Sequence, residues 1–135
     1  MKTYILLLAL VTCLFYSCND NDNGTQNPLS GLGLLGDWDI NGRGIDNVSS
    51  LEALCCESIT FLDDSNANDL KGTFVSDDSS GIITNGTFTV DIEANSIVYT
   101  TENDNTYALE FTIDNNVLEV WYFEDGARYW TSYAK

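Results

Sequence analysis

Paired acids and adjacent cysteines are the residues whose types and spacing could support chemistry in this sequence. The chain contains no histidine, which excludes imidazole bases, histidine metal ligands and histidine-containing triads. Asp63-Asp64 and Asp77-Asp78 lie at the ends of apolar runs, where aspartate favours turns by bonding to nearby backbone. A catalytic carboxylate pair would need mutual burial, and nothing in the sequence indicates it. We therefore predict that the protein is not an enzyme and uses no cofactor or metal.

Cys55 and Cys56 are a candidate disulfide with a structural role, and a redox role is the alternative. Neighbouring side chains of an extended strand point to opposite faces and cannot bridge. A bond between them needs a distorted turn, which the break before Glu57 could provide. We expect this bond in an oxidising compartment. Two adjacent thiols do not supply the tetrahedral ligand set of a zinc site.

The N-terminal residues have the order of a secretory leader. Lys2 precedes a nearly continuous apolar run over residues 4–15, which is short for a membrane-spanning helix and typical of a signal-peptide core. Ser17-Cys18 then precedes an abrupt change to Asn and Asp. This resembles the lipobox of bacterial lipoproteins and implies that residues 1–17 are a signal peptide and that Cys18 carries the lipid. Cys13 is the second candidate for the attachment site.

The resemblance also implies a location. A lipidated cysteine would anchor the protein to the outer membrane, so the membrane is an expected partner through the lipid alone. Acidic residues directly after Cys18 resemble the surface-export signal of Bacteroidetes lipoproteins, which implies exposure at the cell surface. Residues 18–33 are polar and rich in Asn and Asp, and we predict a disordered tether there. Residues 34–135 are long enough for one domain with a modest core.

Charge excludes one class of partner. The whole chain has a formal charge of −16 from 21 acidic and 5 basic residues, and the predicted leader contains Lys2 but no acid. The remainder is therefore more acidic still. Such a surface repels phosphate backbones and anionic lipid headgroups, so we predict no binding to nucleic acid.

Short runs of alternating apolar and polar residues, separated by Asn, Asp and Gly, predict an all-β domain. Ser49 and Glu52 have capping-box spacing and predict a single helical turn at 49–54. The predicted strands cover residues 36–40, 57–62, 70–76, 86–92, 96–101, 106–113, 117–123 and 127–133.

The turns between the last strands predict mutually consistent registers. Asp125-Gly126 is a strong two-residue hairpin signal and places Tyr122 opposite Tyr129. A loop at 115–116 pairs Phe111 with Val120, a loop at 103–105 pairs Ile97 with Phe111, and a turn at 94–95 pairs Val90 with Tyr99. Every turn keeps the same residues on one face, which a shift by one residue would reverse. This inward-facing set is Phe88, Val90, Ile92, Ile97, Tyr99, Tyr107, Leu109, Phe111, Ile113, Leu118, Val120, Tyr122, Tyr129 and Tyr133.

An antiparallel meander of about eight strands has exposed edges unless it closes into a barrel or splits into a β-sandwich. Gly36-x-Trp38 on the first strand, Arg128 on the last and the lipoprotein leader make the region 34–135 resemble a bacterial lipocalin-like lipoprotein domain. The resemblance implies a barrel in which Trp38 closes one end and Arg128 packs across it as a cation. The registers instead place Arg128 on the outer face with Trp121 and Trp130. The β-sandwich is the alternative fold.

Two functions are compatible with these features. In the first, a lipocalin-like barrel binds a small apolar or aromatic ligand in a partly wet pocket near the barrel end. An eight-stranded barrel has room for its own side chains or one small ligand, and Tyr99, Tyr122 and Tyr129 are the candidate pocket residues. In the second, the domain holds no ligand and acts as an interaction or structural module of an envelope complex. Trp121 and Trp130 on the outer face would then contact a protein partner.

Overall fold

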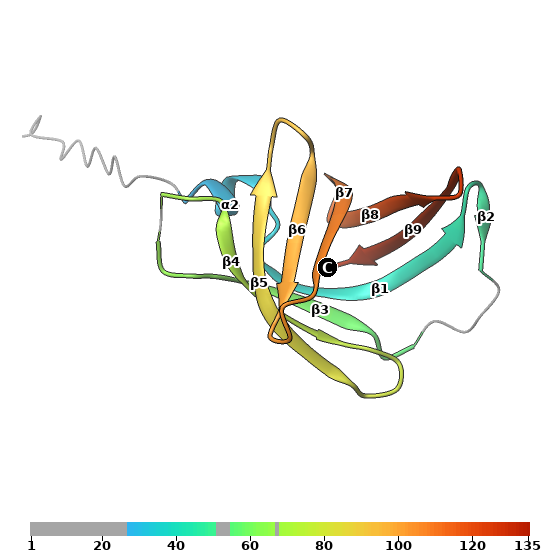
Figure 1. Cartoon of the computed structure of the whole chain (residues 1–135), viewed down its shortest axis with the longest axis horizontal. Coiled ribbons are helices and arrows are strands. Elements are labelled where there is room, and N and C mark those ends of the chain that lie inside the picture. Colours follow the sequence, from blue (N-terminus) through green and yellow to red (C-terminus); the bar gives the residue numbers. More distant parts are fainter. Residues whose placement is uncertain (1–26, 51–54, 67) are drawn as a thin grey trace, which may run out of the picture.

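The computed structural model describes residues 27–50, 55–66 and 68–135. Almost all of the regular structure is one antiparallel sheet that closes into a barrel of eight strands, with the short β2 added at one edge (Figure 1). The elements are α2 (Pro28–Leu32), β1 (Gly36–Ile45), β2 (Val48–Ser49), β3 (Ser58–Asp63), β4 (Lys71–Asp77), β5 (Ile83–Asp91), β6 (Ser96–Thr101), β7 (Thr106–Asp114), β8 (Val117–Glu124) and β9 (Ala127–Ala134). The predicted all-β meander is confirmed, and it forms a barrel instead of a β-sandwich.

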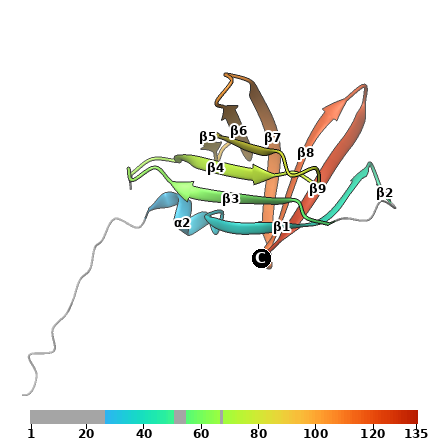
Figure 2. The same ribbon diagram turned by 90° about the horizontal axis from the view of Figure 1, so that it is seen from below.

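The barrel closes because β1 pairs with two strands at once. Its first residues pair with β3, with Trp38 opposite Ile59. Its later residues pair with β9, with Gly44 opposite Trp130, after a register shift that follows Ile40. Figure 2 shows β1 lying alongside β3 and then continuing toward β2. The sequence predicted an end at Ile40, so it missed the half of β1 that completes the barrel.

The registers are partly as predicted. Tyr122 lies opposite Tyr129, as the hairpin turn at 125–126 required. The β6–β7 turn lies one residue earlier than predicted, since the Thr101 N–H donates to the Asn105 carbonyl oxygen. Ile97 therefore pairs with Leu109 and not with Phe111.

The β5–β6 pairing is shifted in the same way. Val90 lies opposite Ile97 and not opposite Tyr99, because four residues, 92–95, connect the two strands. Both errors are shifts by two residues, and side chains alternate with a period of two. The inward-facing set therefore keeps its face in the strands. Ile92 is the exception, because it lies in the turn and is exposed.

One end of the barrel, which we call the closed end, is filled by apolar side chains. Leu29, Leu34 and Trp38 are fully buried there, and the Trp38 indole N–H donates to the Leu34 carbonyl oxygen at 2.7 Å. The ammonium group of Lys135 lies 4.3 Å from the centre of the Trp38 ring. It donates to the carbonyl oxygens of Gly33 and Leu35 at 2.8 and 2.7 Å.

The helix α2 corrects the predicted extent of the tether. The Asn27 side chain caps α2 by accepting from the Leu29 N–H, and Gly33 ends the helix with a left-handed φ of 73°. Since Leu29 belongs to the core, α2 packs with the domain, although the sequence analysis assigned its residues to the tether. The predicted helical turn at 49–54 falls mostly outside the described residues, and Ser49 itself lies in β2.

Two inward-facing glycines make room for phenylalanine rings in the core. Gly72 lies opposite Phe88, and Gly86 lies opposite Phe74. A Cβ atom at Gly72 would lie 2.6 Å from the Phe88 ring, and one at Gly86 would lie 2.8 Å from the Phe74 ring. Each ring therefore covers the glycine across from it. Phe74 in this position meets Tyr99 edge-on, with ring centres 5.3 Å apart.

Candidate functional site

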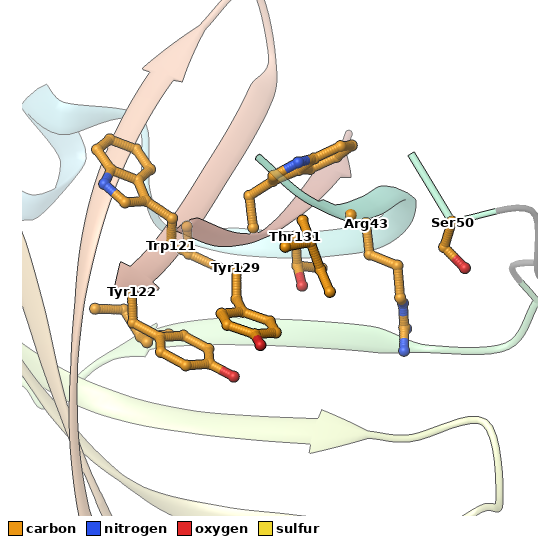
Figure 3. Close-up of a pocket in the computed structure, with 11 residues that line it drawn as sticks. Arg43, Ser50, Trp121, Tyr122, Tyr129 and Thr131 are labelled. Atoms are coloured by element: carbon orange, nitrogen blue, oxygen red, sulfur yellow. The ribbon is translucent and has the colours of Figure 1, made fainter. Parts of the chain in front are cut away.

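The end opposite α2 and Trp38, which we call the open end, carries the turns at 46–47, 78–82, 102–105 and 125–126. A pocket of about 330 Å³ lies between β1, β8 and β9 (Figure 3). It is lined by Arg43, Gly44, Ile45, Ser50, Leu109, Val120, Trp121, Tyr122, Tyr129, Trp130 and Thr131. Large exposed apolar residues also gather in the elements of this end, including Ile45, Ile82, Ile83, Tyr107, Tyr122 and Phe123.

The β8–β9 hairpin supplies the aromatic wall of the pocket. Asp125 and Gly126 both have positive φ, 50° and 83°, as a tight two-residue turn requires. This turn places Tyr122 opposite Tyr129, and their rings stack with centres 5.2 Å apart and planes 10° apart. Figure 3 shows both tyrosines pointing to one side of the hairpin and Trp121 to the other.

A second pocket, of about 220 Å³, adjoins the first and shares Leu109 and Val120 with it. Tyr99 lies in its wall, and burial followed by the nearby Tyr133 raises the pKa of the Tyr99 hydroxyl far above its usual range. The hydroxyl oxygen of Thr101, also in this wall, is buried without a hydrogen-bond partner. The sequence placed Tyr99 with the other two candidate tyrosines in one pocket, whereas the structure places it in the adjoining one.

Arg43 is a pocket residue that the sequence analysis missed. It lies on the later half of β1, opposite Thr131, which in turn lies opposite the inward-facing Val120. Its guanidinium forms an ion pair with Glu57, just before β3. The pair thus connects β1 to β3 beyond the point where their backbone ladder ends, and the Arg43 Nε stays buried without a hydrogen-bond partner.

The ion pair also acts on Tyr133. Burial is the main cause that raises the pKa of the Tyr133 hydroxyl, the charge of Glu57 raises it further, and the charge of Arg43 lowers it. Tyr133 therefore keeps its proton to a higher pH than an unperturbed tyrosine does. Sequence periodicity gives no signal for Arg43, because the register shift after Ile40 reverses the alternation of faces in the later half of β1 and only this shift turns Arg43 inward.

The structure differs from the prediction in one of the three barrel-closure residues. Gly36 and Trp38 lie in β1 as the resemblance implied, and Gly36 adopts a positive φ of 112° beside the Lys135 side chain. The cation over Trp38 belongs to Lys135. Arg128 instead stacks on Trp121 at 4.4 Å and pairs with Glu119 at 2.6 Å. The outer-face position that the register predicted for Arg128 is therefore right.

The outer tryptophans have partners within the domain. The Trp121 indole donates to Glu110 at 3.1 Å, and the Trp130 indole donates to the Asp46 carbonyl oxygen at 3.0 Å. Trp130 also lies against β1, where a Cβ atom at Gly44 would come within 2.7 Å of its ring. Both side chains are half-buried. The pair therefore packs largely against its own barrel.

The predicted disulfide is absent from this structure. Cys55 and Cys56 are both free and exposed. Cys56 does adopt the distorted backbone that a bond would need, with φ of 69°. The two thiols interact by a hydrogen bond, which together with the Cys55 charge raises the pKa of Cys56.

The predicted turn role of the acids is found at Asp64 and Asp78. Asp64 accepts from the Asn66 N–H at 2.9 Å. Asp78 accepts from the N–H and hydroxyl of Ser80 and from the Ile82 N–H, and the Ser80 hydroxyl is the main cause of its lowered pKa. Within residues 27–50, 55–66 and 68–135, no His, Cys, Asp or Glu cluster could hold a metal ion.

No family model, curated protein or solved structure matches this chain. Its function must therefore be inferred from its own geometry. The predicted signal peptide, Cys18 and Cys13 lie outside the described residues. Among the helices that the structure describes, none is long and apolar enough to cross a membrane.

Proposed function

We propose that the protein is a lipocalin-like, outer-membrane-anchored lipoprotein whose barrel binds a small, mostly apolar ring compound at the open end. The observation that carries this proposal is the asymmetry of the barrel. One end is filled by Trp38 and its neighbours, whereas the other contains two adjoining pockets, one of which is lined by the stacked pair Tyr122 and Tyr129.

The size and lining of the pockets favour this ligand class. A hollow of about 330 Å³ is at the small end of the range for ligand sites, roughly 300–1,000 Å³. Flat aromatic walls favour flat ligands, because offset stacking aligns the two faces. A long acyl chain would have to extend toward the closed end, where Phe61, Phe88 and Ile97 are buried and in contact. The ligand is therefore compact.

The leader and the fold together support the anchoring part of the proposal. Cys18 would carry the lipid, and the domain begins at the closed end with α2. This arrangement leaves the open end accessible to a ligand outside the membrane, on the cell surface if the acidic residues after Cys18 act as an export signal. We propose no catalytic role, since the side chains of Asp64 and Asp78 bond to turn backbone.

Native mass spectrometry of the full chain, released gently from membranes, tests the proposal. We expect a co-purifying small molecule on the wild type and its loss from Tyr129→Ala, which removes half of the stacked wall. Ile83→Ala is the matched control, because Ile83 is apolar and 61 % exposed at the same end of the barrel but lines neither of the two pockets. Wild-type protein without any bound molecule, even after incubation with a panel of aromatic compounds, would contradict the proposal.

The exposed apolar rim of the open end favours a second candidate, an interaction module of an envelope complex. Phe123 and Ile83 are each 61 % exposed, and Ile45, Ile82 and Tyr107 in the elements of this end are exposed as well. Under this alternative, Ile83→Ala weakens crosslinking to a partner protein and Tyr129→Ala does not. The two variants thus distinguish the two functions.

A further inference from the structure

The larger pocket contains a charged group whose hydrogen-bonding capacity is only partly used. Arg43 is the one charged residue among those that line this pocket in the described part of the chain. Its Nη2 donates to a single carboxylate oxygen of Glu57, although a guanidinium can serve two acceptors side by side. Its Nε is buried and has no hydrogen-bond partner. A buried donor without a partner destabilises the site until an acceptor reaches it.

A bound molecule could supply the missing acceptor. The Arg43 side chain is 33 % exposed, so it has room to turn toward the pocket while Glu57 holds its other nitrogen. The stacked Tyr122 and Tyr129 line the same pocket. A ring lying against the tyrosines can therefore carry its acceptor to the guanidinium.

The charge of that acceptor is set by Glu57. Arg43 and Glu57 together are neutral, so a neutral acceptor such as an amide or ketone oxygen gains a hydrogen bond without meeting net charge. A carboxylate would place a second anion on one guanidinium, beside the Glu57 carboxylate. Two carboxylates that share one guanidinium lie close together and repel each other. The chain's net charge of −16 adds to this repulsion of a negatively charged ligand.

We propose that the Arg43–Glu57 pair makes the open-end pocket selective for uncharged ring compounds that carry a hydrogen-bond acceptor, and that it rejects their carboxylate analogues. This inference rests on the proposed ring-binding function and names the chemical class of the ligand. Glu57 acts as the excluding charge, and Arg43 acts as the donor.

Three probes with one ring system separate these roles. 2-Naphthamide has a neutral acceptor, 2-naphthoate has the same shape with a negative charge, and 2-methylnaphthalene has no acceptor. Their affinities for the full chain in lipid nanodiscs can be measured by equilibrium dialysis, with empty nanodiscs as the correction for lipid partition. We expect the wild type to bind the amide about tenfold or more tightly than the carboxylate, the factor that 1.4 kcal/mol represents.

Variants of the pair should change the selectivity in opposite ways. Glu57→Gln keeps the shape and removes the excluding charge, so naphthoate should bind about tenfold more tightly than to wild type. Arg43→Gln should weaken naphthamide by a similar factor and leave methylnaphthalene unchanged. Near-UV circular dichroism checks that each variant is folded. If Arg43→Gln does not fold, the affinities of Glu57→Gln for naphthamide and naphthoate test the selectivity.

The outcomes separate this inference from the function on which it rests. Equal binding of amide and carboxylate to the wild type, or no gain of naphthoate binding in Glu57→Gln, would overturn the selectivity while leaving ring binding in place. Methylnaphthalene binding as tightly as naphthamide would overturn the role of the acceptor. No binding of any probe above the empty nanodiscs would overturn the proposed ring-binding function, and the selectivity with it.

Discussion

Replacement of Gly86 by alanine tests the barrel geometry directly. The added Cβ atom would lie 2.2 Å from the Thr100 carbonyl oxygen and 2.8 Å from the Phe74 ring. The oxygen belongs to the backbone of β6, whose ladder with β5 includes Gly86 opposite Thr101. It cannot withdraw without disturbing that ladder. The Phe74 ring would also leave its edge-on contact with Tyr99.

The expected loss of stability follows from these two contacts. Overpacking a well-packed site costs about 1–3 kcal/mol, and the backbone clash puts Gly86→Ala at the upper end of that range. Loss of an aromatic pair adds roughly 0.5–1.5 kcal/mol. We therefore expect the free energy of unfolding to fall by about 3.5–4.5 kcal/mol. With a urea m-value of roughly 1–3 kcal/mol/M, the midpoint followed by tryptophan fluorescence should fall by more than 1 M.

Gly31→Ala is the matched control. A Cβ atom at Gly31, within α2, meets nothing within 4 Å, and alanine in a helix is about 0.5–1 kcal/mol more favourable than glycine. This variant should be as stable as the wild type or slightly more stable. A further change of Phe74 to leucine should restore only part of the loss in Gly86→Ala, since the carbonyl clash remains. If the unfolding free energies of Gly86→Ala and Gly31→Ala agree within about 1 kcal/mol, the close approach of β5 and β6 is wrong.

Three further predictions concern the closed end, the buried phenols and the anchor. Lys135→Met removes the cation over the closed-end tryptophan and two hydrogen bonds, so thermal unfolding should show a loss of about 1–2 kcal/mol; Arg128→Met should lose less than half as much, and equal losses would contradict the assignment. Burial keeps Tyr99 protonated in the folded state above the pH at which it ionises in the unfolded chain, so its contribution is present below pH 10 and declines above it, by up to about 1.4 kcal/mol per pH unit. Urea titrations at pH 8 and 11 should therefore show a smaller alkaline decline for Tyr99→Phe than for wild type, and identical declines would refute the effect. Cys18→Ala should abolish acylation and move the protein from the membrane to the soluble fraction; loss of acylation in Cys13→Ala instead would assign the anchor to Cys13.

The faces of the strands could be predicted from the sequence because side-chain alternation is local. Tyr122 and Tyr129 follow from the turn at 125–126, whose residues accept positive φ. The turns at 92–95 and 102–104 could not be placed to the residue, since several Asn and Asp side chains near them suit a turn equally well. An error of two residues in a register leaves every face unchanged, which is why the inward-facing set survived both shifts.

The missed parts of the site depend on contacts between distant segments. Arg43 lies past a register shift in β1, and local periodicity does not continue across such an irregularity. Lys135 is two residues after the inward-facing Tyr133 and would share its face, but it lies after the end of β9. Its place over Trp38 exists only once the barrel has closed. The resemblance assigned that role to Arg128 because it lies on the last strand, whereas its parity points it outward.

The double pairing of β1 sets the order in which the chain can fold. The strands from β3 to β9 form successive hairpins through short connections, so they can assemble from local contacts. The closing contacts join residues 82 to 102 positions apart, such as Arg128 with Asp46 and Lys135 with Gly33, and long loops close slowly. We expect a folding intermediate in which β9 is an unpaired edge, and its residues are largely apolar or aromatic. Such an edge invites pairing with another chain, and the mutual repulsion of highly acidic chains protects the intermediate from aggregation until β1 covers it.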